Sequence, residues 1–411
     1  DLGYVLLVMA PAGVVYCMNY SVTALGVVYF IISTLLLPLM VQAFSCLIAW
    51  IISLISSKMR NKNIITMVAS LVFLAAYFYL YSKMGDIISG LIANGTAVAV
   101  AFKKYAFPAY YFGVGIAEHN LTYLLLFTVC TLVVFELVYA ILSRSFRQIT
   151  TVKKGVARIE YKEKSMRASS PSAALLRKDI RHFIGNPMYV LNAWMGEILL
   201  IVACVAMLIK KDFLTEFLPM LNGAGETLGL LLCVILCGLS CTNLITAPSI
   251  SLEGKNLWIA QSIPVPAAVV LRAKVKLQML LCIPITAFTA LLMGLILKIE
   301  LPMVALVVLV SAAFNVFTAL LGVVVNLRFP KFDYINETVV IKQSMSTMIC
   351  MFGSMAVVLV LSLLYVLLLA STVAPILFLA ICLALLATAC TLMWRYLAHG
   401  GSLRFAALQT D

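Results

Sequence analysis

The run KLQMLLCIPITAFTALLMGLIL, residues 276–297, has a single charged residue, at its first position. A bilayer core of about 30 Å is crossed by an α-helix of about 20 apolar residues, so this run predicts a transmembrane helix. The whole chain shares this character: 64% of its residues are hydrophobic and 11% are charged, against about 45–50% and about 25% in soluble domains. The mean hydropathy is +1.10. We therefore expect an all-α polytopic membrane protein.

Similar runs predict ten transmembrane helices, at residues 2–20, 24–45, 64–82, 121–142, 188–209, 227–247, 276–297, 303–325, 347–370 and 374–395. Lys and Arg orient such helices, because cytoplasmic loops carry an excess of both. If segments 58–63, 143–187, 248–276, 326–345 and 395–411 are cytoplasmic, they hold 23 of the 29 Lys and Arg residues. The basic loops and the C-terminus are thus expected on the cytoplasmic side, facing anionic lipid, which accounts for the net charge of +13 without nucleic acid.

Residues 3–63 and 276–331 follow one plan. Each has an apolar helix with a central proline (Pro11; Pro284), a short break, and a second apolar helix that ends in a basic turn. Two further spans follow each copy, and parallel repeats of this kind are common in transporters. We expect a 6+6 design whose first two helices lie upstream of Asp1. Its parts are a first half (1–142), a basic linker with an elbow helix (143–187), a second half (188–395) and a tail (396–411).

The connector before the quoted run reads SLEGKNLWIAQSIPVP, residues 251–266. It predicts a short helix over 252–261, ended by Pro264 and Pro266 because proline lacks an N–H and disfavours helical geometry before it. A structured helix at the mouth of a membrane bundle indicates a docking surface for another protein. Its candidate residues are Leu252, Glu253, Gly254, Lys255, Leu257, Trp258, Ser262 and Pro264, with Ile259 on the apolar side.

Residues 169–187 read SSPSAALLRKDIRHFIGNP and predict a second short amphipathic helix. Ser170 or Ser172 would cap it. Its predicted apolar face consists of Ala174, Leu175, Ile180, Phe183 and Ile184. It is either an interfacial elbow on the membrane or a linker between the halves, and both can hold.

The segment 326–345 combines five charged residues with Phe329, Phe332 and Tyr334. This mixture suits internal salt bridges or a partner surface, and it is too small and too acidic for nucleic acid. The charged residues are Arg328, Lys331, Asp333, Glu337 and Lys342.

Motifs for catalysis are missing from the sequence. It contains no P-loop, no His-Glu-x-x-His and no Gly-x-Ser-x-Gly. Cys233, Cys237 and Cys241 share a helix face, which indicates packing rather than a metal site. We therefore expect no catalytic residue, no metal and no cofactor bound by this chain.

Two carboxyl groups, Glu136 and Glu197, fall inside predicted spans. A carboxyl at membrane depth is a functional-site hypothesis by default. The pair could serve a secondary transporter coupled to protons or cations. Alternatively, each is a protonated or hydrogen-bonded packing residue.

Residues 251–265, Lys274 and the segment NLRFPKFDYINETVVIKQS, 326–344, carry a resemblance to a known family. There the chain resembles the membrane subunits of ABC-2-type exporters, in particular bacterial ABC exporters whose single permease chain carries two six-span halves. Residues 169–192 are similar to the elbow that opens the second half. The resemblance implies that 251–266 is a coupling helix in a cleft of a separate ATPase subunit, with Glu253 and Lys255 as polar contacts and Trp258 as apolar anchor.

The resemblance also implies what surrounds the chain. A multi-pass permease of the bacterial plasma (inner) membrane would pair with ATPase subunits, expected as a pair, which bind ATP and Mg. Membrane lipids and an amphipathic or peptide cargo would be its other partners. An ion-coupled secondary transporter is the alternative, and a membrane-embedded lipid-modifying enzyme a third, which lacks the polar cluster it would need.

Overall fold

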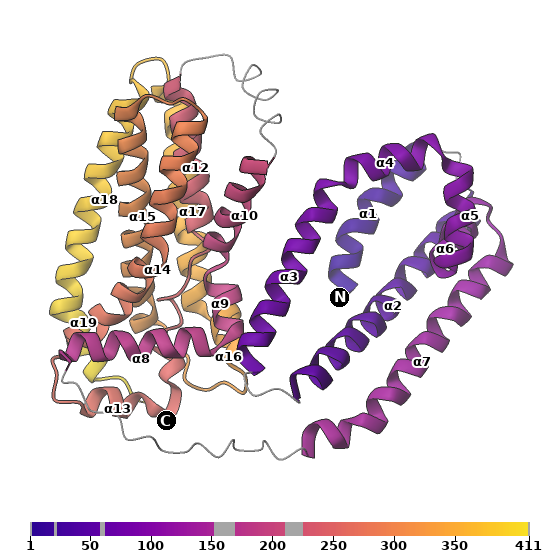
Figure 1. The fold of residues 1–411 in the computed structure, drawn as a ribbon, viewed down its shortest axis with the longest axis horizontal. Coiled ribbons are helices and arrows are strands. Elements are labelled where there is room, and N and C mark those ends of the chain that lie inside the picture. Colours follow the sequence, from indigo (N-terminus) through magenta and orange to yellow (C-terminus); the bar gives the residue numbers. More distant parts are fainter. Residues whose placement is uncertain (1, 20–22, 58–61, 152–168, 210–224, 410–411) are drawn as a thin grey trace. The chain divides into compact units, whose positions relative to one another are not determined.

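The computed structural model describes residues 2–19, 23–57, 62–151, 169–209 and 225–409. Within these ranges every regular element is a helix, apart from an isolated β-bridge between Trp194 and Asn243. The chain forms two compact units, residues 1–163 and 164–411 (Figure 1). Their boundary falls inside the expected linker 143–187. Residues 152–168 of that linker and 58–61 of the first basic turn lie outside the described ranges.

The first unit is built around two long apolar helices, α2 and α7, that pack against each other and against α6. The Trp50 indole N–H of α2 donates a hydrogen bond of 2.9 Å to the Ser145 hydroxyl of α7. Helix α2 continues past Pro38 to Ser57, as its apolar run predicts. The unit's helices are α1 (Leu2–Asn19), α2 (Ala24–Ser57), α3 (Lys62–Ser82), α4 (Met84–Ala93), α5 (Gly95–Tyr105), α6 (Phe107–Ala117) and α7 (Leu121–Thr151).

The second unit is a bundle centred on α14 and α15, which pack against each other and contact most of the remaining helices. Its long helices are α14 (Ala267–Ile296), α15 (Leu301–Arg328), α17 (Met345–Leu364) with the π-helix η3 (Tyr365–Leu369), and α18 (Pro375–Ala398). Its shorter elements are α8 (Pro171–Gly185), α9 (Pro187–Ala193), α10 (Met195–Ile209), α12 (Gly225–Ser240), η2 (Ser251–Asn256), α13 (Leu257–Ser262), α16 (Glu337–Gln343) and α19 (Gly400–Ala406).

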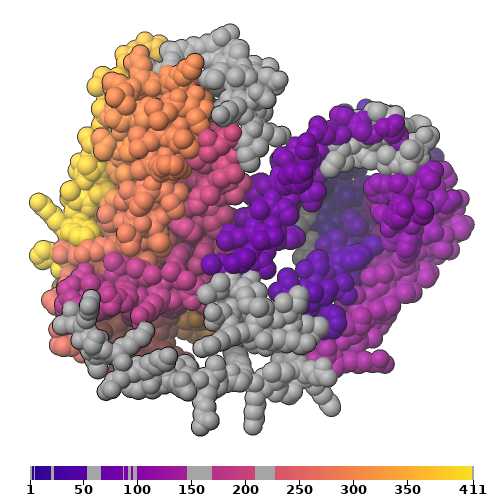
Figure 2. All heavy atoms as spheres, in the orientation of Figure 1, coloured from indigo at the N-terminus to yellow at the C-terminus, as the bar shows by residue number. Residues whose placement is uncertain are grey.

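Four of these short helices, α8, α13, α16 and α19, gather at one end of the second unit (Figure 1). This end also contains segments 248–276 and 326–345, so we call it the basic end. Helix α8 packs along α14 there, and its side chains form a continuous band across the visible face (Figure 2). The elements that carry the predicted cytoplasmic loops of this unit therefore lie together.

Six stretches are long and apolar enough to cross a membrane: Ala24–Ile52, Leu121–Ser145, Ala267–Ile296, Leu301–Arg328, Glu337–Leu369 and Pro375–Ala398. A bent pair, Thr66–Ser82 with Met84–Gly90, would make a seventh. Three more apolar helices are shorter, Val5–Asn19, Met195–Leu208 and Thr227–Ser240. A polytopic membrane protein is thus confirmed for the described ranges, while the count of ten spans and the 6+6 design stay predictions.

Two of the expected spans are not continuous helices. The expected span 227–247 is wrong beyond Ser240: residues 241–250 are buried but irregular. The expected span 188–209 is interrupted at Trp194, between α9 and α10. Irregular backbone is tolerated at membrane depth only where protein or a cavity supplies its hydrogen bonds.

Side-chain amides supply those bonds for the irregular segment 241–250. The Gln278 carbonyl accepts from the Thr246 backbone N–H at 3.0 Å, and the Gln278 amide donates to the Asn243 carbonyl at 3.0 Å. The Asn326 carbonyl accepts from the backbone N–H groups of Ile250 (2.8 Å) and Ser251 (3.1 Å). Two polar residues in the apolar helices α14 and α15 therefore hold this segment in place.

The substitution Asn326→Ala tests this role. It would leave two buried backbone N–H groups without an acceptor, at roughly 1–3 kcal/mol each. We expect a marked fall in the thermal unfolding midpoint of the detergent-purified protein. Asn256→Ala is the matched control, because Asn256 is exposed and its side chain makes no capping bond; equal midpoints for both variants would contradict the assignment.

Candidate functional site

The segment 251–266 is not the single helix that the sequence predicts. It consists of the 3-10 segment η2, which is kinked internally at Gly254 with φ 52° and ψ −135°, followed by the short helix α13. Only glycine adopts a positive φ readily, and a Cβ there would lie 2.9 Å from the Tyr334 hydroxyl. The Tyr334 hydroxyl donates to the Leu252 carbonyl at 3.3 Å. Gly254 thus lets η2 turn back against the bundle.

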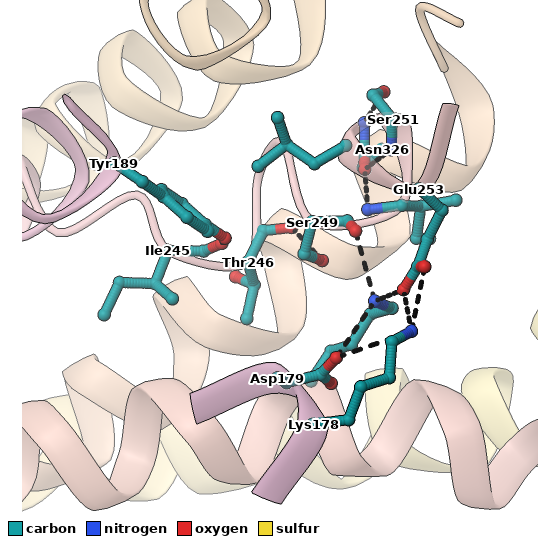
Figure 3. Close-up of polar contacts among 12 residues, drawn as sticks. Lys178, Asp179, Tyr189, Ile245, Thr246, Ser249, Ser251, Glu253 and Asn326 are labelled. Carbon is teal, nitrogen blue, oxygen red and sulfur yellow. Dashed lines mark hydrogen bonds and ion pairs between the residues drawn. The ribbon is translucent and has the colours of Figure 1, made fainter. Parts of the chain in front are cut away.

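Glu253 points into the bundle rather than outward (Figure 3). Its Oε1 accepts hydrogen bonds of 2.7 Å from both Lys274 Nζ of α14 and Lys178 Nζ of α8. Lys274 also donates to the Ser249 carbonyl at 3.1 Å. Asp179 of α8 completes the cluster, 3.8 Å from Lys274 and 3.9 Å from Lys178. This Glu253 cluster (Lys178, Asp179, Glu253 and Lys274) connects η2 to α8 and α14.

Burial and charge act in opposite directions on Glu253. The side chains of Glu253 and Lys274 are 9% and 4% exposed, whereas that of Lys178 is 46% exposed. Burial alone would raise the pKa of Glu253, but attraction to Lys274 and Lys178 and their hydrogen bonds lower that pKa from 4.5 to about 2. Glu253 is therefore ionised at neutral pH and its charge is neutralised internally.

The start of η2 is fixed to α15 and α17. Asn326 donates to the Ser251 hydroxyl at 2.7 Å and to the Ser346 hydroxyl at 3.1 Å. The Ser251 hydroxyl in turn accepts from the Lys331 backbone N–H at 2.9 Å. Through Asn326 and Glu253, η2 contacts the three helices α8, α14 and α15, and Asn326 links it indirectly to α17.

The other predicted docking residues divide by exposure. Leu252 and Leu257 are buried in the bundle, so they hold the segment in place. Lys255, Ser262 and Pro264 are exposed. Two apolar side chains also face outward, Trp258 (61% exposed) and Ile259 (46%). We call Lys255, Trp258, Ile259 and Ser262 the exposed face of α13.

The second predicted loop lies beside this segment. Arg328, Asp333 and Lys342 are exposed, and Lys331 and Glu337 are half-buried. No ion pair joins these five side chains to one another within the described ranges; the Glu337 carboxylate instead accepts a hydrogen bond from the Asn186 amide. Internal salt bridges among these five side chains, one of the two interpretations of this loop, are therefore not seen in the described ranges.

Helix α8 begins where its cap predicts: the Ser170 hydroxyl accepts from the Ala173 N–H at 3.4 Å. The residues of the predicted apolar face differ in their burial within the protein. Leu175 and Phe183 are buried, but Ala174 and Ile184 are exposed. In this orientation of α8, Asp179 lies 3.8 Å from Lys274.

The two intramembrane acids differ. Glu136 of α7 is exposed. Glu197 of α10 is fully buried and accepts hydrogen bonds from the Asn243 amide at 3.0 Å and the Thr286 hydroxyl at 2.8 Å. Glu136 belongs to the first unit and Glu197 to the second. No group of three or more metal-ligating side chains occurs in the described ranges, and Cys233, Cys237 and Cys241 are buried in the apolar core.

Sequence reasoning missed Lys178, Asp179 and Lys274 as partners of Glu253. The available signal was Lys274 itself, a lysine in the first turns of α14 that has the apolar neighbours Ala273 and Val275. Such a lysine is rarely buried unless an acid pairs with it.

The unequal exposure of the two lysines predicts unequal effects of removing them. Lys274→Met would break a buried pair and should lower the free energy of unfolding by roughly 3 kcal/mol. Lys178→Met removes a half-exposed partner and should cost less than about 1 kcal/mol. Denaturant titration of both purified variants measures the two values; a larger loss for Lys178→Met would show that Glu253 is not held mainly by Lys274.

Comparisons with known proteins agree with the helical membrane architecture. A family model described as a membrane protein of 12 TMs matches residues 3–395, nearly the whole chain. No curated protein and no solved structure matches this chain. The chain, with its apolar helices and its interrupted second-unit spans, therefore belongs to this family of membrane proteins with twelve transmembrane helices.

Proposed function

We propose that this chain is the permease subunit of an ATP-driven exporter and that the exposed face of α13 binds a separate ATPase subunit. The observation that carries the proposal is Trp258, a large aromatic side chain that is 61% exposed on a short helix at the basic end. Aromatic anchors with polar surroundings concentrate binding energy in protein interfaces. The resemblance of 251–266 to a coupling helix supports the same role.

The connections of η2 suit the transmission of force. Glu253 joins η2 to Lys274 of α14 and Lys178 of α8, and Asn326 joins it to α15. A displacement of α13 by a partner would therefore move the two central helices of the bundle. In this proposal Glu253 acts inside the permease, and the partner contacts come from Lys255, Trp258 and Ile259.

The permease role places ATP and Mg in the partner subunits, since this sequence has no P-loop. The basic end would face the cytoplasm of a bacterium, where the ATPase subunits would bind. The cargo would be amphipathic or a peptide, because the described helices present apolar side chains. This chain would supply the pathway and no catalytic residue.

The decisive experiment is mild-detergent purification of the native protein, with mass spectrometry of the proteins that accompany it. We expect an ATPase subunit with a P-loop, lost from the double variant Trp258→Ala/Ile259→Ala. Leu403→Ala is the matched control, because Leu403 is a 76% exposed apolar residue on α19 at the same end. Absence of an ATPase at every salt and detergent condition would remove the proposal, and loss in both variants would remove α13 as the docking site.

An ion-coupled secondary transporter is the second candidate, and the buried carboxyl of Glu197 favours it. Glu136, its expected companion, belongs to the first unit. Under this alternative Glu136→Gln and Glu197→Gln should each abolish ion-driven uptake in proteoliposomes. Under the exporter proposal, ATP-driven transport should survive both neutral substitutions.

A further inference from the structure

Glu197 lies where two interrupted helices meet. Helix α9 ends at Ala193 and α10 begins at Met195, while α12 ends at Ser240. The two breaks are joined by the Trp194–Asn243 bridge and by a hydrogen bond of 2.8 Å from the Leu244 N–H to the Ala193 carbonyl. Interrupted helices form many of the ion and substrate sites of transporters. We call this place the helix junction (Ala193–Glu197 with Ser240–Leu244).

The Glu197 carboxyl is only partly satisfied there. Its Oε1 accepts from Asn243 and Thr286, but its buried Oε2 has no hydrogen-bond partner. The amide of Asn315 on α15 donates to the Thr286 hydroxyl at 3.1 Å, and the Asn315 carbonyl oxygen is also buried without a partner. An ionised carboxylate would leave half of its charge on an oxygen that no donor reaches, which is the costly arrangement for a buried anion.

No positive charge compensates for this within the described ranges. On the elements packed against α10, the titratable groups nearest the junction are Cys282 of α14, Cys237 of α12, Cys241 directly after α12, and Tyr189 of α9. The thiols are neutral at physiological pH, and the Tyr189 hydroxyl donates to the Ile245 carbonyl. Lys274 of α14 is bound to Glu253 and precedes Thr286 by twelve residues, about 18 Å at the helical rise. Helix α15 offers the neutral Asn315.

Glu253 is an ionised carboxylate in the same unit, and its surroundings can be compared with those of Glu197. It accepts hydrogen bonds from two lysines on two helices. Glu197 has neutral donors and the N-terminal end of α10, whose dipole favours an anion only weakly compared with a paired cation. The two buried glutamates therefore have opposite electrostatic surroundings.

From this geometry we infer that Glu197 is a proton-binding site, and that its bound proton keeps the helix junction closed. A metal ion fits less well: Ca²⁺ and Mg²⁺ take six or more oxygen ligands, and the junction offers two unpartnered oxygens, those of Glu197 and Asn315. A proton satisfies the carboxyl alone. The inference goes beyond the proposed function and holds for an ATP-driven or an ion-driven permease.

The sign of the pH effect follows from linkage. In an open junction water reaches the carboxyl, and its pKa returns to the ordinary value of about 4.3. The closed form then binds more protons than the open form above that pH, so rising pH favours opening, by up to tenfold per pH unit. Opening ceases to depend on pH once the closed form itself loses the proton.

Two buried cysteines report opening. Cys241 lies two residues before Asn243, and Cys282 lies one helical turn before Thr286. Both cysteines are almost fully buried. Full-length protein in proteoliposomes is treated with N-ethylmaleimide between pH 5.5 and 8, and labelling of each cysteine is quantified by peptide mass spectrometry. The ratio of wild type to Glu197→Gln cancels the intrinsic pH dependence of the thiols. We expect this ratio to rise three- to tenfold per pH unit over part of the range.

Three outcomes separate the possibilities. A ratio that stays constant with pH would overturn the inference. Glu300→Gln is the matched control, since Glu300 is exposed on the same unit; it should label like wild type, and a control that behaves like Glu197→Gln would also overturn it. Labelling that falls when Na⁺ replaces choline at constant pH would show a cation site in place of the proton.

A second readout keeps the carboxyl group and covers a Glu197→Gln variant that fails to fold. A neutral carboxylic acid has a carbonyl stretching band in the infrared that a carboxylate lacks. We expect the band in wild type at neutral pH and a shifted band in Glu197→Asp. Absence of the band in folded wild-type protein would overturn the inference without affecting the ATPase-docking proposal.

Discussion

Residues 241–250 run through the second unit as isolated turns and irregular backbone rather than as a continuous helix, and the bundle depends on how their backbone is satisfied. Gln278 of α14 and Asn326 of α15 provide acceptors and donors to this segment. Gly322 of α15 makes the close approach possible, since a Cβ there would lie 2.1 Å from the Thr246 hydroxyl. The hydrogen-bonding needs of this backbone therefore determine the residue type at three positions of the central helices: Gln278, Gly322 and Asn326.

This constraint also explains why the polar residues of α14 and α15 are interior. Inside a membrane no water is available to an unpaired backbone group, so side-chain amides in the bundle serve as its hydrogen-bond partners. Asn326 is shared between the irregular segment and the hydroxyls of Ser251 and Ser346, and Gln278 bonds both Thr246 and Thr318. Each amide uses donor and acceptor groups together, which fixes its orientation and that of the segment it holds.

The sequence predicts the long apolar helices well and their interruptions poorly. Hydropathy identifies α14 and α15 because their apolar runs are long, and the Ser170 cap marks the start of α8. It fails at 241–250 because Leu244, Ile245 and Ala247 look like a continuing span, while the irregular backbone depends on Gln278 and Asn326, which lie 30 to 80 positions away. Glu253 was expected to face outward for the same reason: its partners Lys178 and Lys274 come together only through tertiary packing. Local sequence patterns predict the helices, whereas the partners of the buried polar side chains are set by the tertiary structure.

The helix junction and η2, which leads directly into α13, are the two ends of one stretch of backbone. Asn243, hydrogen-bonded to Glu197, begins the stretch, and Glu253, bound to two lysines, ends it. Between them, side-chain hydrogen bonds and isolated backbone contacts take the place of a regular helical ladder, so the stretch can shift by exchanging partners while α14 and α15 stay intact. A regular helix in the same place would have to break to move. The irregular segment is therefore the element of this bundle through which a push at α13 would reach the carboxyl of Glu197.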